Sequence, residues 1–368
     1  MTPFDFRPRA RVLFGPGEFA RLGEVARELG GTRCLLVADQ GMVEVGYAKE
    51  ATRALRARRM DVFAFHEFET EPTTATIEAG RAFAEPLGVN LIVGLGGGSS
   101  LDCAKALNFV LTNGGVIRDY WGYGKASRPL LPMIGIPTTA GTGSEAQGDA
   151  MIIDAESRVK MACADPKAVF RAVILDPKLT LSQPASVAAA AGYDAISRAV
   201  ESLVSTRRTP VSECFSRESW RLLNANYEHV LGDPGDLDAR GAMLVGAHFA
   251  GMAVENSTLA AAYACAAPLT ARYHVRHGSA MAALLPSVVK WNSATALREY
   301  RDFHSHDLVK RLRDLAHTAA LPASLREIPV PEEALPRLAE EAAAQWTGRF
   351  NPRPFNTAAA LEIYQSAY

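Results

Sequence analysis

The first 180 residues alternate short apolar runs with segments of helical spacing, and this alternation constrains the fold more than any other feature. Apolar runs that end in a polar or glycine-rich turn, as buried strands do, occur at 33–39, 61–68, 90–95, 131–137 and 173–176. Segments of helical spacing lie between them at 47–59, 73–87 and 101–111. Because parallel strands are joined by crossover helices, the pattern predicts a Rossmann-like α/β domain with a parallel sheet.

The pattern changes near residue 180, where the strand-like runs stop. The chain is rich in helical segments from Ser182 onward, and Ser182 and Pro184 are residue types that favour the start of a helix. Proline-rich breaks at 322–336 and 352–354 are typical of loops between helices. We therefore predict an α/β domain over residues 1–180 and an all-helical domain over residues 181–368.

The composition excludes several classes of protein. Of the 368 residues, 48% are hydrophobic and 21% are charged, the net charge is −1, and no cluster of Lys and Arg suggests a nucleic acid or a membrane as partner. No apolar run is long enough to span a bilayer, and the N-terminus lacks the apolar core of a signal peptide. The five cysteines are scattered and form no Cys-x-x-Cys pair. This favours a cytoplasmic location and cysteines that serve as small core residues.

A glycine-rich loop, Gly94-Leu-Gly-Gly-Gly-Ser99, follows one predicted strand and precedes a predicted helix. Glycines let a pyrophosphate approach the backbone closely, and the N-terminus of the helix offers N–H donors and a partial positive charge. A glycine run alone is also compatible with a tight turn that binds nothing.

A second loop, 137–145, also follows a predicted strand and is rich in hydroxyl groups. Thr138, Thr139, Thr142 and Ser144 alternate with glycines, and such side chains suit a ribose, a phosphate or a carboxamide. A helix-capping turn rich in Ser and Thr would look the same. Because ligands of open α/β sheets bind at the carboxyl ends of strands, the two loops together indicate a nucleotide site.

The two loops carry a resemblance to a known family. Gly-Gly-Gly-Ser-x-x-Asp-x-Ala-Lys (96–105) and Pro-Thr-Thr-x-Gly-Thr-Gly-Ser-Glu (137–145) resemble the cofactor loops of the iron-containing (group III) alcohol dehydrogenases. The match runs nearly end to end and includes Phe14-Gly-Pro-Gly-Glu18, Gly192-Tyr-Asp194 and His277-Gly278. The resemblance implies an NAD(P)-binding domain followed by an all-helical domain, as in dehydroquinate synthase-like proteins, and a homodimer or larger homo-oligomer.

The resemblance also implies which residues contact the dinucleotide. Carried over position by position, they are Asp39, Gly96, Gly97, Gly98, Ser99, Asp102, Thr138, Thr139, Thr142 and Lys160. Asp39 matches the acidic residue that binds the adenosine ribose, and a carboxylate there repels a 2′-phosphate, so NADH is favoured over NADPH. The alternative role for Asp39 is to cap a turn. Glu71 departs from the family, which usually has Asn at this position.

The resemblance implies that two of the four ligands of the family's metal site are replaced in this chain. One Asp and three His hold a divalent metal in the family, and the matching residues here are Asp194, Arg198, Tyr263 and His277. Ala267 replaces a further His that the family uses in proton transfer. A site of this class requires three or four N or O ligands, and a guanidinium cannot bind a metal ion. We therefore predict that the catalytic metal is absent.

These residues suggest how hydride transfer could proceed without a metal. Our hypothesis is that Arg198 stabilises the carbonyl oxygen, that Tyr263 or His277 supplies a proton, and that Asp194 orients Arg198. The alternative is an inert Asp194–Arg198 ion pair, since the two residues are spaced i, i+4 on a predicted helix over 189–204.

The sequence therefore predicts an NAD(P)-dependent oxidoreductase that interconverts a small aldehyde or ketone and an alcohol. His274 and Arg276 flank His277 and either bind an acidic substrate or lie on the surface. Two further alternatives stay open. One is a non-redox lyase or cyclase on the same scaffold, as in the related sugar-phosphate cyclases, and the other is a non-catalytic homologue.

Overall fold

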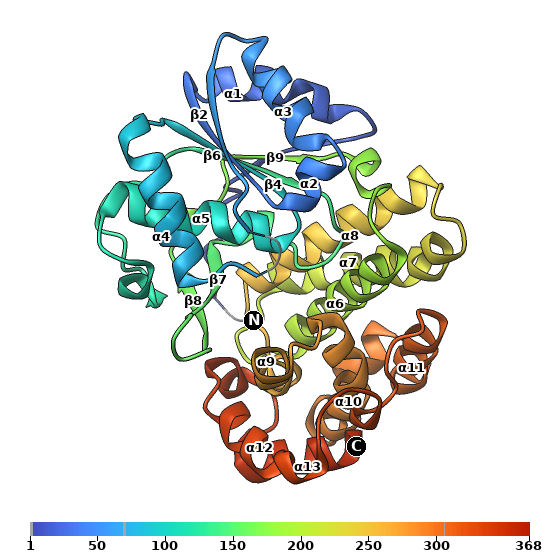
Figure 1. Ribbon diagram of the computed structural model, residues 1–368. Helices are drawn as coiled ribbons and strands as arrows, with labels where there is room; N and C mark the ends of the chain where they lie inside the picture. The colour runs from blue at the N-terminus through green and yellow to red at the C-terminus, as the bar shows by residue number, and fades with distance from the viewer. Residues whose placement is uncertain (1–2, 69–70, 305) are drawn as a thin grey trace. The chain divides into compact units, whose positions relative to one another are not determined.

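The computed structural model describes residues 3–68, 71–304 and 306–368 (Figure 1), which form two compact units. The sheet unit comprises Arg7–Thr139 and Gly143–Gln183. The helical unit comprises Pro184–Tyr368 together with residues 3–6 and the short segment Ala140–Thr142. The chain thus leaves the sheet unit at Gln183, near the boundary predicted at 180/181, and the hydroxyl-rich loop is divided between the units.

The sheet unit is built on a six-stranded sheet with the order β1-β9-β6-β4-β2-β3, in which every pairing is parallel. Its strands are β1 Arg11–Phe14, β2 Arg33–Ala38, β3 Asp61–Phe65, β4 Leu91–Gly96, β6 Met133–Pro137 and β9 Ala172–Leu175. The prediction of a parallel α/β domain followed by helices is confirmed. Strand β1 was not predicted, because it has four residues with only Leu13 buried and lies at the sheet edge.

The two faces of this sheet are covered by different helices (Figure 1). Alternate residues of β2, such as Cys34 and Leu36, share one core cluster with residues of α1 (Leu22–Glu28) and α3 (Tyr47–Arg56). On the other face, α5 (Gly98–Asn113) packs closely on β4, because a Cβ at Gly94 would lie 3.1 Å from atoms of Leu101 and Ala104. Helix α4 (Thr74–Ala84) packs beside α5. Strand alternation therefore explains the three layers.

A second, three-stranded sheet with the order β5-β8-β7 also belongs to the sheet unit. Its strands are β5 Gly122–Tyr123, β7 Asp149–Ile153 and β8 Lys160–Ala164, and β7 pairs antiparallel with β8. The burial of β7 and β8 alternates residue by residue, as in a sheet with one covered face. The sequence prediction missed this sheet, whose strands have only two to five residues.

The helical unit holds α6 Ala185–Val204, α7 Pro210–Gly232, α8 Leu237–Glu255, α9 Ala261–Tyr273, α10 His277–Phe303, α11 Leu308–Thr318, α12 Leu335–Ala343 and α13 Thr357–Ala367. Helices α6, α9 and α10 are rich in buried alanine, which allows close approach of helix backbones. In the part of the chain that the structure describes, no helix combines the length and the apolar character needed to cross a membrane.

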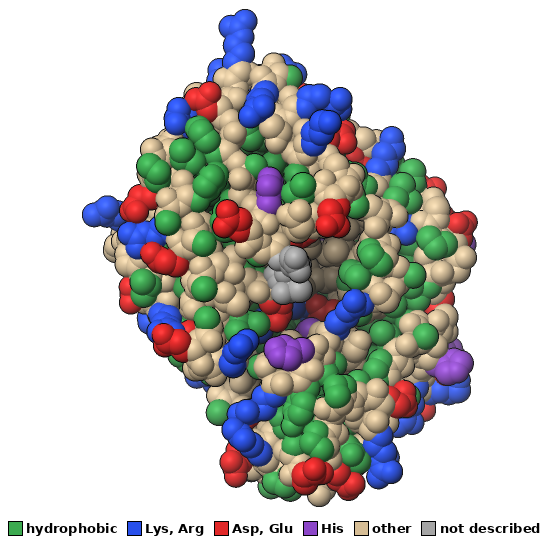
Figure 2. Space-filling model, in the orientation of Figure 1, with side chains coloured by type: hydrophobic (Ala, Val, Ile, Leu, Met, Phe, Trp, Pro, Cys, Tyr) green, Lys and Arg blue, Asp and Glu red, His purple; other side chains and the backbone are tan. Residues whose placement is uncertain are grey.

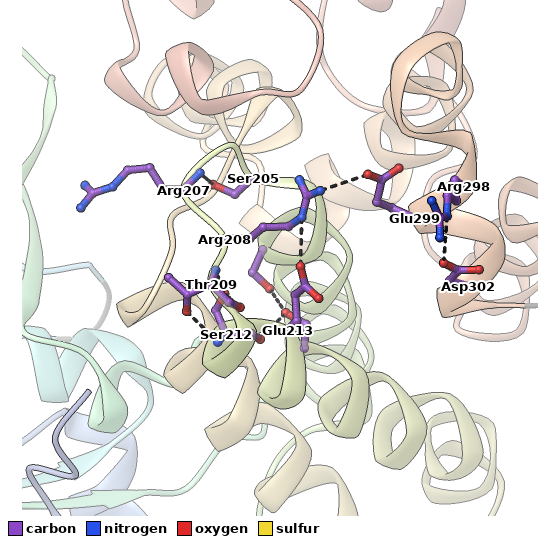
Figure 3. A network of polar contacts seen from close by, with 11 residues as sticks. Ser205, Arg207, Arg208, Thr209, Ser212, Glu213, Arg298, Glu299 and Asp302 are labelled. Carbon is purple, nitrogen blue, oxygen red and sulfur yellow. Dashed lines mark hydrogen bonds and ion pairs between the residues drawn. The ribbon is translucent and has the colours of Figure 1, made fainter. Parts of the chain in front are cut away.

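An arginine network fixes the turn after α6 (Figure 3). Arg208 donates from Nε to Glu213 of α7 at 3.1 Å and from Nη2 to Glu299 of α10 at 3.0 Å. Thr209 caps α7 by accepting a hydrogen bond from the Ser212 amide. The C-terminal end of α6, which carries several residues of the candidate site, is thereby tied to two other helices.

Charges of both signs cover the surface. The sequence has 39 basic and 40 acidic residues. On the face that Figure 2 shows, Lys and Arg are interspersed with Asp and Glu, and no large patch of one sign is visible.

Candidate functional site

The glycine-rich loop joins β4 to α5 in a conformation that requires glycine. Gly96 has φ +141°, and a Cβ there would lie 2.5 Å from Ser100 Oγ and 2.7 Å from Asp39 Oδ2. Helix α5 begins at Gly98, three residues before the predicted start at 101. The glycines therefore serve both backbone conformation and close approach, as predicted for a phosphate-binding turn.

The N-terminus of α5 has the features of an anion site. Gly97 is the N-cap residue, and no side chain caps the helix. Gly97, Gly98 and Ser99 are all partly exposed, and the helix behind them is 16 residues long. Because the first N–H groups of a helix carry its partial positive charge, this turn can bind a phosphate through its backbone.

Asp39 lies directly after β2 and is already engaged with protein donors. Its Oδ1 accepts a hydrogen bond from the Met42 amide at 3.1 Å, and its Oδ2 accepts one from Ser100 Oγ at 2.7 Å. The capping role that we gave as the alternative is thus confirmed, because Asp39 is the N-cap residue of α2 (Gln40–Glu44). The side chain remains partly exposed, and its contact with a ribose remains a prediction.

The second loop lies against the first, as expected for neighbouring strand ends. Gly96 of β4 pairs in register with Pro137 of β6, and the Thr138 amide donates to the Gly96 carbonyl at 3.0 Å. A Cβ at Gly97 would lie 3.4 Å from Cγ2 of Thr139. Thr142 lies in the segment that belongs to the helical unit. The structure therefore brings the predicted residues Thr138 and Thr139 to the glycine loop.

Asp102 and Lys105 hold the second loop in place from within the protein. Asp102 accepts hydrogen bonds from Ser144 Oγ at 2.6 Å and from the Met151 amide at 3.1 Å. Lys105 is fully buried, and its Nζ donates to the Ser144 carbonyl, to Ser144 Oγ and to the Asp149 carbonyl. Burial raises the pKa of the Asp102 carboxyl, and the nearby Lys105 opposes this rise.

This arrangement gives a structural meaning to the Asp-x-Ala-Lys motif. Both oxygens of Asp102, which we predicted to contact the cofactor, bind donors of the protein itself. The motif therefore holds the hydroxyl-rich loop in place through hydrogen bonds to Ser144. A charged pair spaced i, i+3 in an otherwise apolar helix was the sequence signal for this role.

Lys160 lies at the start of β8 and forms an ion pair with Glu71. Glu71 is the residue that departs from the family pattern. Lys160 therefore balances the charge of Glu71 within the sheet unit.

The helical unit brings together the four residues that the sequence analysis matched to the metal site of the family. Asp194 and Arg198 come from α6, Tyr263 from the first turn of α9, and His277 from the first residue of α10. Arg198 Nε donates to Asp194 Oδ2 at 3.1 Å, and His277 Nε2 lies 3.7 Å from Asp194 Oδ1. The rings of Tyr263 and His277 are 4.9 Å apart. The predicted grouping of these four side chains is therefore present.

Gly278 allows α10 to start against α6. A Cβ at this position would overlap the carbonyl oxygen of Ala190. The glycine after His277 is thus needed for the close packing that brings the imidazole to Asp194.

The donor set does not fit the metal that the family implies. Asp194 and His277 supply one oxygen and one nitrogen, and the other oxygen of Asp194 is bound to a guanidinium. Over residues 3–68, 71–304 and 306–368, no group of three or more His, Cys, Asp or Glu has a geometry that could hold a metal ion. A cation in the place of a ligand would also repel a divalent ion.

Glu201 completes this cluster, and the sequence analysis missed it. It lies on α6 at i+3 from Arg198 and i+7 from Asp194, so that the three share one face of the helix. Glu201 is almost fully buried, and burial raises the pKa of its carboxyl to about 7, against the effect of backbone N–H donors and of Arg198. An acidic residue in an alanine-rich apolar helix was the available signal.

The remaining candidates lie apart from the cluster or at its edge. His274 and Arg276 are exposed, and Arg276 donates to Ser186 Oγ at 3.1 Å. His229 pairs with Asp236 on the surface, and the rings of His304 and His306 contact each other.

The cysteines behave as the sequence suggested. Cys34, Cys103, Cys163 and Cys265 are buried and free, and only Cys214 is exposed. Burial raises the pKa of the Cys34 and Cys163 thiols to about 12, so these thiols are unreactive core groups.

Comparisons with known proteins agree with this architecture. A model of the iron-containing alcohol dehydrogenases matches residues 8–177, and a model of the C-terminal region of the same family matches residues 188–368. The chain is 29% identical to the NAD-dependent methanol dehydrogenase of Bacillus methanolicus, with 100% of each chain covered. It is 28% identical to the sulfoacetaldehyde reductase of Bilophila wadsworthia, with 97% of each covered. A crystal structure of 1,3-propanediol oxidoreductase superimposes with a TM-score of 0.96 at 28% identity over 100% of both chains.

Proposed function

Because the chain belongs to the iron-containing alcohol dehydrogenase family, we propose that it is an NAD(H)-dependent oxidoreductase that works without a bound metal ion. Its reaction interconverts a small aldehyde or ketone and the corresponding alcohol. The observation that carries the proposal is the buried ion pair of Arg198 with Asp194, at two positions where the family has metal ligands.

The sheet unit holds the nucleotide in this proposal. The uncapped N-terminus of α5 binds the pyrophosphate, Thr138 and Thr139 line the adjacent loop, and Asp39 binds the ribose. Bound NADH supplies the hydride for reduction, and NAD⁺ accepts it in the reverse direction. Asp39 favours NADH, since its carboxylate repels the 2′-phosphate of NADPH.

Arg198 stabilises the charge that develops on the substrate. Hydride addition to a carbonyl carbon leaves negative charge on the oxygen, and a guanidinium presents five N–H donors in a fixed plane. Its Nε–H is used by Asp194, which fixes the orientation of that plane. Asp194 is therefore a positioning residue for Arg198, and the pair replaces the electrostatic role of a divalent ion.

Tyr263 donates the proton that completes the alcohol, with His277 beside it. A phenol carries a dissociable proton, and the Tyr263 ring lies 4.9 Å from the His277 ring. In the oxidation direction the same groups accept the proton. His277 is the alternative donor, and Tyr263→Phe and His277→Gln variants distinguish the two.

Basic side chains near His277 favour an acidic carbonyl substrate. His274 and Arg276 flank His277 in sequence, and Arg198 adds a permanent positive charge to the helical unit. A relative that is named for sulfoacetaldehyde, an anionic aldehyde, supports this choice. We further propose a cytoplasmic protein, in keeping with its free cysteines, and a homodimer or larger homo-oligomer by analogy with the family.

The test is oxidation of NADH by a panel of neutral and acidic small aldehydes, followed at the nicotinamide absorbance, with and without a strong chelator. The proposal predicts turnover that the chelator does not change. Turnover that is abolished by the chelator and restored by a divalent ion would contradict it. Binding of NADH without oxidation by any carbonyl would instead favour a non-redox enzyme on this scaffold.

A further inference from the structure

The helix that carries Tyr263 is capped by a carboxylate from another helix. Residue Ala260 is the N-cap of α9 and supplies no side-chain cap. Glu201 of α6 takes this role: its Oε1 accepts from the Ala262 amide at 2.7 Å and its Oε2 accepts from the Tyr263 amide at 3.0 Å. A cap from within the same chain segment would fix only the end of α9, whereas this cap also ties α9 to α6.

The cap from Glu201 binds the backbone of Tyr263, the residue that the proposed reaction needs. Tyr263 is one of the two residues whose amides Glu201 holds, and Arg198 lies one helical turn before Glu201 on the same face of α6. The carboxylate therefore joins the backbone of Tyr263 to the helix that carries Arg198 and Asp194. A displacement of this first turn of α9 would move the phenol relative to the guanidinium.

We infer that Glu201 is a positioning residue that sets the phenol of Tyr263 in register with Arg198, through two hydrogen bonds to the first turn of α9. The inference rests on the proposed function, because it assumes that Tyr263 donates the proton. Glu201 itself binds the backbone amides of Ala262 and Tyr263, so it acts through Tyr263.

The residue type matters as much as the position. A carboxylate offers an acceptor oxygen to each amide, whereas a glutamine offers one oxygen and one NH₂ group. In Glu201→Gln the NH₂ group would face an amide N–H, so one of the two hydrogen bonds is lost while the volume of the side chain is kept. Burial opposes a charge on Glu201, and the amides of Ala262 and Tyr263 together with Arg198 favour the charge.

The experiment is a double-mutant cycle on kcat for NADH-dependent carbonyl reduction, with Glu201→Gln, Tyr263→Phe and the double variant. We expect Glu201→Gln to lower kcat by about ten- to a hundredfold, as small displacements of a catalytic group do. The KM for NADH should stay unchanged. In the Tyr263→Phe background the same substitution should cause no further loss, because the phenol to be positioned is already absent.

A merely structural role would give a different result. General destabilisation by Glu201→Gln would lower kcat by the same factor in both backgrounds, and this additive outcome would overturn the inference. The matched control is Asp176→Asn, which alters another buried carboxylate that binds backbone amides. Asp176 accepts three amide hydrogen bonds, from Gly17 at 2.9 Å and from Phe19 and Lys178 at 3.0 Å. We expect the control to lower thermal stability and to leave kcat unchanged.

Backbone hydrogen exchange gives a readout that does not depend on activity. The amides of Ala262 and Tyr263 should exchange faster in Glu201→Gln than in the wild type, and Glu201→Asp should show an intermediate rate if its shorter side chain keeps one bond. Unchanged exchange at these amides would overturn the inference. Full activity of Tyr263→Phe would overturn the proposed role of Tyr263, and this outcome is distinct from an additive cycle.

Discussion

At the scale of single residues, the central feature is a buried arginine that shares one cluster with Asp194, Tyr263 and His277. Arg198 is paired with Asp194 and mostly buried, so its charge acts in a region of low dielectric constant. A buried cation held by one carboxylate is suited to stabilise an oxyanion. The same burial makes the pair sensitive to truncation, since an isolated Asp194 carboxylate would be left behind.

Substitution of Arg198 tests this role. We expect Arg198→Ala to lower kcat by about a hundred- to a thousandfold, the range for removal of one oxyanion donor. It should also lower the free energy of unfolding by about 3–5 kcal/mol, because a buried ion pair is broken. Arg198→Lys, which keeps the charge, is the control and should retain part of kcat. Turnover that is unchanged in Arg198→Ala would remove Arg198 from the mechanism.

The raised pKa of Glu201 predicts that the stability of the protein depends on pH. Its pKa is raised from 4.5 to about 7, so between these pH values the folded state holds a proton that the unfolded state has lost. The contribution of this group to stability is therefore fully present below pH 4.5 and declines as the pH rises through 7, by about 3 kcal/mol in total. Denaturant unfolding at pH 5 and pH 8 measures it. The free energy of unfolding of the wild type, relative to Glu201→Gln, should fall over this interval, and a rise would contradict the assignment.

At the scale of elements, glycines decide how closely helices approach the site. Gly278 follows His277 at the start of α10 and lies against the backbone of α6 at Ala190. A Cβ added at Gly141 would lie 3.0 Å from the Cβ of Ala191, which belongs to the same helix α6. The backbone of α6 is therefore approached from two segments of the helical unit next to Asp194.

Substitution of Gly278 tests the packing of α10 on α6. Gly278→Ala should destabilise the protein by about 1–3 kcal/mol, as overpacking of a core does, and should lower kcat, because α10 carries His277. Gly232→Ala is the matched control, since among the described residues no atom beyond its own turn of helix lies within 4 Å of the added Cβ. Thermal unfolding measures both variants. Equal melting temperatures for the two variants would contradict the close contact.

The elements also show what the sequence could predict. All five apolar runs form strands of the parallel sheet. Four of them are buried along almost their whole length, as central strands of a parallel sheet are, and β3 at the edge is only partly buried. The three-stranded sheet was missed, because its strands have only two to five residues, and β7 and β8 alternate between partly exposed and buried residues. Spacing on α6 predicted the pairing of Asp194 with Arg198, whereas the cap from Glu201 to α9 depends on a contact 61 residues away along the chain.

The nucleotide loops show a similar limit. The glycines and threonines could be assigned from their place between strand and helix. The hydrogen bonds by which Asp102 and Lys105 hold the second loop could not be predicted, because they depend on the position of β7 and of the Ser144 loop. Motifs therefore predicted which loops form the candidate site, and long-range contacts decide which motif residues instead hold those loops in place.

At the scale of the whole molecule, ligand binding should be visible as a gain in stability. Saturation with NADH at a hundred times its Kd raises the free energy of unfolding by about 2.7 kcal/mol, which thermal unfolding detects. We expect a smaller shift with NADPH at equal concentration, since Asp39 lies at the predicted ribose position. Asp39→Asn keeps the capping oxygen for Met42 and should reduce the difference. A larger shift with NADPH than with NADH in the wild type would contradict the preference.

The most direct test of the whole account is the zinc and iron content of the purified protein, measured beside that of the double variant R198H/Y263H. The variant restores one aspartate and three histidines at the family positions and is the positive control for metal uptake. We predict well under one metal ion per wild-type chain with full NADH-dependent activity, and an increased metal content in the variant. One tightly held ion per wild-type chain, whose removal abolishes activity, would contradict the replacement of the metal by Arg198.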